Sequence, residues 1–204
     1  IQSSKNPDIT RVVKPEAREE DIISEVSLRP RKLDEYVGQE QMKIHLKVAI
    51  ESAKIRKNPL EHILFYWPPG LWKTTISTII AHEMGSAIKS TSGPAIEKQS
   101  DIVSLLTSLT EWEILFIDEI HRLRPQIEEI LYSAMEDYNI DIMIGSGTGS
   151  TSVKMDIPKF TLVGATTKLS SLSNPLRDRF GNVMKLDFYE PADLAKIIKR
   201  SFHI

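Results

Sequence analysis

An apolar run, a tight turn and a lysine-bearing helix constrain this chain more than any other feature. Residues 62–66 (HILFY) are apolar and precede Pro68-Pro69-Gly70, a pattern typical of a buried strand that ends in a turn. After Lys73, apolar residues recur at helical spacing, namely Ile76, Ile79, Ile80 and Met84. A phosphate-binding loop, G-x-x-x-x-G-K-[ST], occurs between a strand and a helix in this way.

The chemistry of such a loop is well suited to a nucleotide. Its backbone N–H groups and the positive end of the helix dipole bind phosphates. Lys73 would neutralise the β- and γ-phosphates, and the Thr74 hydroxyl would bind Mg²⁺. Trp67 and Trp72, however, stand where the motif has its outer glycines, and an indole at Trp72 is expected to crowd the phosphates. The alternative is a hydrophobic strand–turn–helix with a surface lysine.

A second apolar run, residues 114–117, ends in the acids Asp118 and Glu119. In a nucleotide hydrolase the first acid coordinates Mg²⁺ through water and the second polarises the attacking water. Two acids at a strand end are also common at helix N-termini. Their position about 45 residues after the P-loop-like segment favours the Walker B interpretation.

A third apolar run, residues 160–165, is followed by Thr166 and Thr167. A polar side chain at this strand end can orient the attacking water. A hydroxyl that caps the next turn fits the spacing equally well.

Two arginines near the end of the chain are candidates for a role in trans. Arg177 or Arg179, supplied to a neighbouring subunit, would stabilise transition-state charge on its γ-phosphate. The alternative is a pair of solvated arginines that interact with Asp178, and the residues alone do not choose.

Buried strands that alternate with helices predict an α/β domain with a parallel sheet covered on both faces. The predicted helices cover residues 40–57, 102–107 and the segment from Ile127 to Ala134. One element interrupts the alternation: residues 140–144 and 153–157 flank GSGTGSTS and predict an inserted β-hairpin over residues 140–157.

The pattern divides the chain into three parts. Residues 1–27 are expected to be an N-terminal arm, residues 28–190 an ATPase domain, and residues 191–204 the start of a second domain that is truncated.

Composition limits the partners. The net charge is −2 and the pI is near 6.3, whereas a domain that grips DNA over its whole surface is usually basic. The chain has no cysteine and no apolar run near the ~20 residues that span a bilayer. We therefore expect a cytoplasmic location and no membrane partner.

Several motifs resemble the RuvB family of AAA+ ATPases almost continuously from about Leu28 to the end. They are LRPRKLDEYVGQE, PPGLxKTT, TSGPAIEK, LFIDEIHRL, EEILYSAMEDY, DIMIG, FTLVGATT and NPLRDRFG. Clamp loaders share the Walker motifs and a nearby arginine, but not IDEIHRL followed by YSAMEDY and DIMIG.

The resemblance implies an ATP hydrolase that uses Mg²⁺, forms a hexameric ring, and works with RuvA to drive branch migration of Holliday junctions in recombination and repair. It implies that the hairpin docks on RuvA, with Val153 and Met155 as exposed apolar anchors. It also implies roles for residues along the nucleotide. The adenine side would be contacted by Leu28, Arg29 and Tyr189, and the phosphates and Mg²⁺ by Gly70, Lys73, Thr74 and Thr75. The nucleotide would be bordered at the subunit interface by Glu136, Asp137 and Tyr138. The arginine finger would be Arg179.

Two parts of the family pattern are expected to be missing, most of the helical lid domain and the C-terminal winged-helix module. Because that module grips DNA, this chain alone is expected to bind Holliday-junction DNA poorly.

All three tryptophans, Trp67, Trp72 and Trp112, stand where RuvB-like sequences carry glycine. Random decay would scatter substitutions over many residue types, and the other motif positions are intact. We therefore hypothesise a lineage that reads UGA as glycine, in which the loop is GPPGLGKTT. If the tryptophans are real, the alternative is an ATP-dead ring subunit or scaffold. A clamp-loader-like AAA+ ATPase is the other alternative.

Overall fold

The computed structural model describes residues 30–66, 73–144 and 151–202 of the chain. The predicted arm over residues 1–27, together with Leu28, Arg29, Trp67, Gly70 and Trp72, lies outside the described residues.

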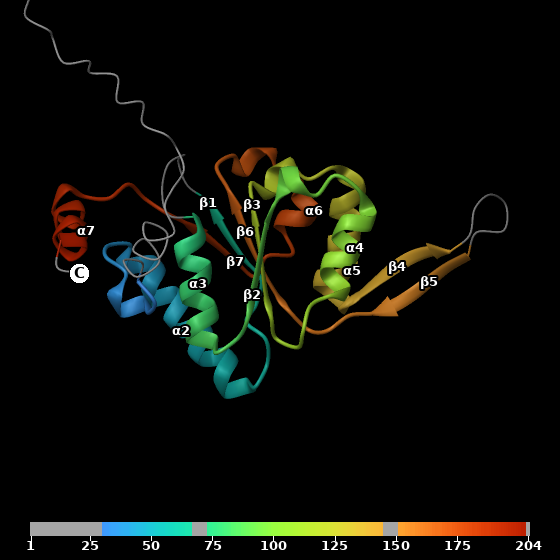
Figure 1. Cartoon of the computed structure of the whole chain (residues 1–204), viewed down its shortest axis with the longest axis horizontal. Coiled ribbons are helices and arrows are strands. Elements are labelled where there is room, and N and C mark those ends of the chain that lie inside the picture. The colour runs from blue at the N-terminus through green and yellow to red at the C-terminus, as the bar shows by residue number, and fades with distance from the viewer. Residues whose placement is uncertain (1–29, 67–72, 145–150, 203–204) are drawn as a thin grey trace, which may run out of the picture.

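A parallel sheet forms the centre, as predicted, and it has five strands in the order β2-β3-β6-β1-β7. The strands are β1 (Ile63–Tyr66), β2 (Ile88–Ser92), β3 (Ile114–Asp118), β6 (Thr161–Thr166) and β7 (Asn182–Lys185). One face is covered by α2 (Glu40–Arg56) and α3 (Lys73–Met84), and the other by α4 (Gln99–Thr107), α5 (Pro125–Asp137) and α6 (Asn174–Arg177) (Figure 1).

The apolar runs of the central strands explain this three-layer arrangement. Alternate side chains of a strand point to opposite faces. Ile63 and Phe65 accordingly enter the core beneath α2 and α3, whereas Leu64 enters the core beneath α4 and α5. Each such burial contributes about 1.5–3 kcal/mol, so both helical layers are required to cover the sheet.

The edge strands β2 and β7 were not predicted from the sequence. Their sequences, IKSTS and NVMK, have no continuous apolar run, and they are only partly buried. An edge strand is covered less completely than a central one, so its hydrophobic signal is weaker.

The inserted hairpin is confirmed as β4 (Asn139–Ile144) paired with β5 (Thr151–Asp156), and it projects from the body of the domain (Figure 1). Thr151 and Ser152, assigned to the tip from the sequence, belong to β5. Ile140 pairs with Met155 and Ile142 with Val153, so these four share one face. Ile140 is fully buried, while Val153 is 43% exposed. The apolar face therefore runs out of the core along the hairpin.

The segment predicted to start a second domain forms α7 (Pro191–Phe202), which lies at the other end of the molecule from the hairpin (Figure 1). Leu194 and Ile198 are exposed on it. Arg200 holds this helix to the start of the domain through Glu35, with Nη2 3.1 Å from Oε2 and Nη1 2.8 Å from the backbone carbonyl.

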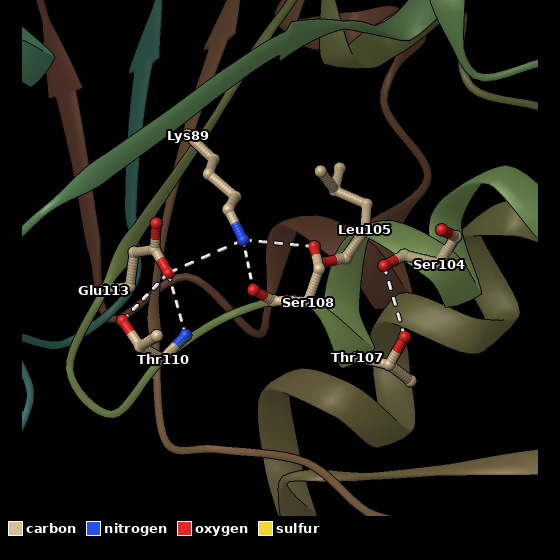
Figure 2. Close-up of polar contacts among 7 residues, drawn as sticks. All are labelled: Lys89, Ser104, Leu105, Thr107, Ser108, Thr110 and Glu113. Carbon is tan, nitrogen blue, oxygen red and sulfur yellow. Dashed lines mark hydrogen bonds and ion pairs between the residues drawn. The ribbon is translucent and has the colours of Figure 1, made fainter.

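The turn before β3 places Trp112 in an unfavourable backbone conformation. Its φ is +65°, in the left-handed region where a bulky side chain is strained and glycine is not. The Trp112 N–H donates to the Lys159 carbonyl at 2.6 Å. Figure 2 shows how the flanks are held: the buried Glu113 carboxylate accepts from Thr110 N and Oγ1 at 2.7 and 3.0 Å, and Lys89 reaches Ser108. A turn tied on both sides cannot relax easily, so position 112 favours glycine.

Candidate nucleotide site

The carboxyl ends of β1, β3 and β6 meet at one edge of the sheet, here called the carboxyl edge. The last residue of β1, Tyr66, lies in register with Thr166 at the end of β6, and Ile117 of β3 lies in register with Gly164. Ligands of open α/β sheets bind outside this edge. The structure therefore brings Thr166 next to the strand that leads into the P-loop-like segment, and Asp118 lies one strand further along the same edge.

Asp118 ends β3, and its Oδ1 accepts the backbone N–H of Glu119 at 2.8 Å. Glu119 turns the chain with a φ of +49°. Its carboxylate forms an ion pair with Arg122, Oε2 to Nη1 3.1 Å. Both acids are partly exposed. A carboxylate at the carboxyl edge of the sheet fits Mg²⁺, which takes one or two protein carboxylates beside phosphate oxygens.

Gly93 links the TSGPAIEK motif to the site, because it packs against the backbone of Glu119. A Cβ at Gly93 would lie 2.5 Å from the carbonyl oxygen of Glu119. The residue is buried in the 3₁₀ turn Gly93–Ala95 that follows β2. Only glycine permits this approach, so Gly93 sets the position of the Glu119 backbone. The motif was evident in the sequence, but the steric requirement for glycine at position 93 was not.

Thr166 is buried, and its hydroxyl has two partners. Oγ1 accepts the Lys168 N–H at 3.0 Å, so it does cap the next turn. It also lies 2.9 Å from Nδ1 of His121. Partial burial lowers the pKa of His121, which favours the neutral ring that can accept the hydroxyl proton. This histidine, four residues after the end of the second apolar run, lies in IDEIHRL and carried no sequence signal of its own.

Of the residues predicted to hold the phosphates, the structure describes those in α3, which begins at Lys73. Lys73 and Thr74 are the first residues of this helix, as a phosphate site at a helix N-terminus requires; their side chains lie outside the described part of the structure. Thr75 is buried. Among the described residues no three histidine or acidic side chains form a metal cluster.

The predicted adenine side is closed by contacts between the start of α2 and the segment before α7. Tyr36 donates a hydrogen bond to Tyr189, and burial is the main cause that raises the pKa of both phenols. Gln39 exchanges two hydrogen bonds with the backbone of Asp187, at 2.6 and 3.1 Å. The ring of Tyr189 lies against Gly38, where a Cβ would approach it to 3.3 Å.

Arg179 lies away from the carboxyl edge. It borders an open hollow of about 490 Å³ that is lined mainly by residues preceding β1, β6 and β7, including Leu60, His62, Lys159 and Gly181. Glu136 binds Arg179, with Oε2 2.8 Å from Nη2. The predicted alternative, an interaction of this arginine with Asp178, is therefore wrong: Arg179 pairs with Glu136.

The rest of the EDY segment follows Glu136 at the end of α5. Asp137 is exposed. Tyr138 has a φ of +53° and is half-buried, with its ring 6.1 Å from that of Phe160 and 6.5 Å from that of His62. The structure thus brings together the predicted interface residues Glu136 and Arg179, and separates them from Asp118, Glu119 and Thr166.

His62 joins the sheet to the end of α5. Its Nδ1 accepts the Leu162 N–H at 2.9 Å, and its Nε2 lies 3.0 Å from the Met135 carbonyl. Burial lowers its pKa, and a neutral ring satisfies both contacts. In the sequence this residue is distinguished only as one position of an apolar run.

On the hairpin, the predicted anchors differ in exposure. Val153 is exposed, as predicted, whereas Met155 is half-buried and packs against the core beneath α4 and α5. Met155 opposes the fully buried Ile140 at the base of the hairpin. The prediction that Met155 is an exposed anchor is therefore wrong, because the core reaches this far along β5.

Comparisons with known proteins agree on one family. Residues 28–186 match the model of the Holliday junction DNA helicase RuvB P-loop domain. The Holliday junction branch migration complex subunit RuvB of Aliarcobacter butzleri (strain RM4018) is 57% identical over 178 residues, covering 87% of this chain and 52% of that protein.

Solved structures of similar proteins give the same result. The Thermotoga maritima RuvB Holliday junction branch migration motor is 50% identical with a TM-score of 0.75, over 85% of this chain and 53% of its own. A point mutant of that protein has a TM-score of 0.76 at 51% identity, over 84% of this chain and 54% of its own. The chain thus spans about half the length of the relatives it matches. No helix in the described residues is long and apolar enough to cross a membrane.

Proposed function

This chain belongs to the RuvB P-loop domain family, and on that premise we propose that it is the ATP-hydrolysing core of a ring motor that drives branch migration of Holliday junctions. The observation that carries the proposal is the separation of the predicted machinery. Asp118, Glu119 and Thr166 gather at the carboxyl edge, while Arg179 faces a hollow away from it. One subunit thus holds two halves of a site, which a ring of identical subunits completes.

Within one subunit, Lys73, Thr74, Thr75 and Gly70 would hold the phosphates. Mg²⁺, held by Thr74 and Asp118, would neutralise charge on the phosphate oxygens when bound. Glu119 would orient and polarise the attacking water, and Thr166 would hold that water through its hydroxyl. The Glu119 carboxylate is partly exposed and forms an ion pair with Arg122 at 3.1 Å, which supports a role that requires contact with water. Leu28, Arg29 and Tyr189 would bind the adenine side.

Across the subunit boundary, Arg179 would approach the γ-phosphate of a neighbour, and Glu136, Asp137 and Tyr138 would border that nucleotide. A guanidinium supplied in trans stabilises transition-state charge. It also makes hydrolysis depend on assembly, because an isolated subunit cannot bring its own Arg179 to its own carboxyl edge. A hexamer is the ring that the family resemblance implies.

The exposed part of the hairpin is proposed to bind RuvA. Its apolar face continues past the buried Ile140 to the half-buried Ile142 and the exposed Val153, which offers a small apolar surface on a projecting element. Holliday-junction DNA would be bound mainly by the C-terminal winged-helix module that the family resemblance implies. A cytoplasmic location follows from the same proposal.

The proposal includes glycine at positions 67, 72 and 112 of the native protein. Support comes from Trp112, whose φ of +65° lies in a tethered turn. An ATP-dead subunit or scaffold is the second candidate if the tryptophans are native, and the hairpin surface would be its remaining function. The position of Trp112 favours the first candidate, because selection for a tryptophan in this conformation has no structural reason.

Calorimetry of ATP–Mg²⁺ binding separates the two candidates. The full-length protein with Trp67→Gly, Trp72→Gly and Trp112→Gly is compared with the tryptophan form, and each is assayed for ATP turnover. We expect binding and turnover only with glycine. Turnover by neither form would support the scaffold. Equal binding by both would show that an indole at position 72 does not crowd the phosphates.

A further inference from the structure

Three side chains of α5 lie on one line along the helix and hold the segment that carries Arg179. Glu128, Tyr132 and Glu136 are spaced four residues apart, so they share a face. Glu128 is buried and accepts from Ser173 Oγ at 2.5 Å and from Tyr132 Oη at 3.0 Å. Ser173 is the N-cap of α6. The start of α6 is therefore fixed to α5 by a buried polar network.

The guanidinium of Arg179 has its own binding place on α5, here called the arginine seat. Its Cζ lies 4.7 Å from the centroid of the Tyr132 ring, its Nη1 donates to the Pro175 carbonyl at 2.9 Å, and its Nη2 donates to Glu136 at 2.8 Å. The Nε is buried and finds no acceptor within the described residues. Of these contacts, only Glu136 supplies an opposite charge.

Glu136 is expected to border the nucleotide, but its carboxylate is badly suited to contact the phosphates. A carboxylate repels a polyphosphate, and it competes with the phosphate for the same guanidinium. Its side chain is 63% exposed and that of Arg179 is 27% exposed. Water screens such a pair, so it is weak enough to be exchanged for a γ-phosphate, whose charge is larger.

We infer that Glu136 is a positioning residue that holds Arg179 in the arginine seat until the nucleotide of a neighbouring subunit takes the guanidinium. This inference rests on the proposed role of Arg179 in trans. The ion pair lowers the fraction of Arg179 that is free to engage, and apparent affinity falls in proportion to that fraction. Tyr132 and Pro175 remain to guide the side chain when the ion pair opens.

The test is ATP hydrolysis by the full-length protein with glycine at positions 67, 72 and 112. Glu136→Gln removes the competing charge and is expected to raise kcat/KM by about two- to five-fold at low salt, the range for an exposed ion pair. Glu129→Gln is the matched control, because Glu129 is an exposed glutamate of the same helix, and it is expected to leave kcat/KM unchanged.

Two further readouts separate this role from a structural one. In an Arg179→Ala background, measured by single turnover, Glu136→Gln is expected to have no effect. The ratio of kcat/KM in the Glu136→Gln variant to kcat/KM in its parent is expected to approach one as the salt concentration rises from about 0.05 to about 0.5 M, because salt screens the ion pair. Glu136→Asp keeps the charge but has a shorter side chain, so its kcat/KM is expected to lie between those of the parent and of Glu136→Gln. It replaces Glu136→Gln if that variant does not fold.

The outcomes that overturn the inference are distinct. A lower kcat/KM in Glu136→Gln, an unchanged one, or an equal change in the Arg179→Ala background overturns it while the function of Arg179 stands. If Arg179→Ala itself hydrolyses ATP like its parent, the proposed trans arginine is wrong and the role of Glu136 fails with it.

Discussion

At the carboxyl edge, Asp118 and Thr166 are held by strand register and backbone hydrogen bonds, whereas in the arginine seat Arg179 is held by a salt bridge, an aromatic ring and one carbonyl. The first arrangement cannot change without disturbing the sheet. The second can change by rotation of one side chain. In the proposed function, the rigid carboxyl edge would bind the nucleotide, and the exchangeable arginine seat would release Arg179 to the nucleotide of a neighbouring subunit.

The largest expected effect is a loss of ATP hydrolysis without a loss of stability. Arg179→Ala in the full-length, glycine-containing protein is expected to lower kcat for ATP by about 10³-fold or more, the range for a trans arginine, with little change in melting temperature. Arg177→Ala is the matched control, because Arg177 is the exposed neighbour in the same motif. Similar losses from both variants would remove the distinction between the two arginines.

A second substitution tests the rigidity of the carboxyl edge. Gly93→Ala places a Cβ against the Glu119 carbonyl at 2.5 Å, and neither backbone can yield cheaply. We expect the free energy of unfolding to fall by about 1–3 kcal/mol and turnover to fall with it. Gly181→Ala is the control, since its Cβ meets the carboxylate end of Glu61, which can move. Urea denaturation of both variants checks this, and a neutral Gly93→Ala would mean that the edge is deformable.

His62 joins β6 to the end of α5 beside the arginine seat, and its titration tests how much this contact contributes to stability. Its folded-state pKa is lowered, chiefly by burial, so the unfolded chain binds the proton more tightly. Stability is therefore full above the unfolded pKa of about 6.5 and is lost as pH falls below it, until the folded pKa is reached. The slope is expected to be at most about 1.4 kcal/mol per pH unit.

Denaturant unfolding at several pH values, in the parent and in His62→Gln, measures this contribution. The variant is expected to be less stable at pH 7 and to lose less stability between pH 7 and pH 5. Parallel curves for the two proteins would show that other groups account for the pH dependence.

The smallest expected effect concerns a position outside both regions. Trp112→Gly relieves the left-handed backbone and is expected to stabilise the domain by roughly 1 kcal/mol, less the contacts of an indole that is 41% exposed. Lys57→Gly is the companion variant, because Lys57 has a φ of +51° at the end of α2. Thermal melting measures both, and a destabilised Trp112→Gly would count against a native glycine there.

The sequence by itself determined the fold class, the central strands and the identity of most of the machinery. Continuous apolar runs such as residues 114–117 can be covered only from two sides, so they predict a parallel sheet between helices. The acids and the threonine could be placed at its carboxyl edge because they directly follow such runs. These are properties of neighbouring residues, which a sequence contains explicitly.

Only the tertiary structure decided the contacts between distant residues. The edge strands β2 and β7 depend on a place beside β3 and β1 and not on an apolar pattern of their own. The pairing of Glu136 with Arg179, the approach of Gly93 to Glu119 and the two bonds of His62 join residues far apart in the chain. The burial of Met155 depends on how far the core extends along the hairpin. Such contacts arise when separate elements pack together, and no local pattern encodes which side chains then meet.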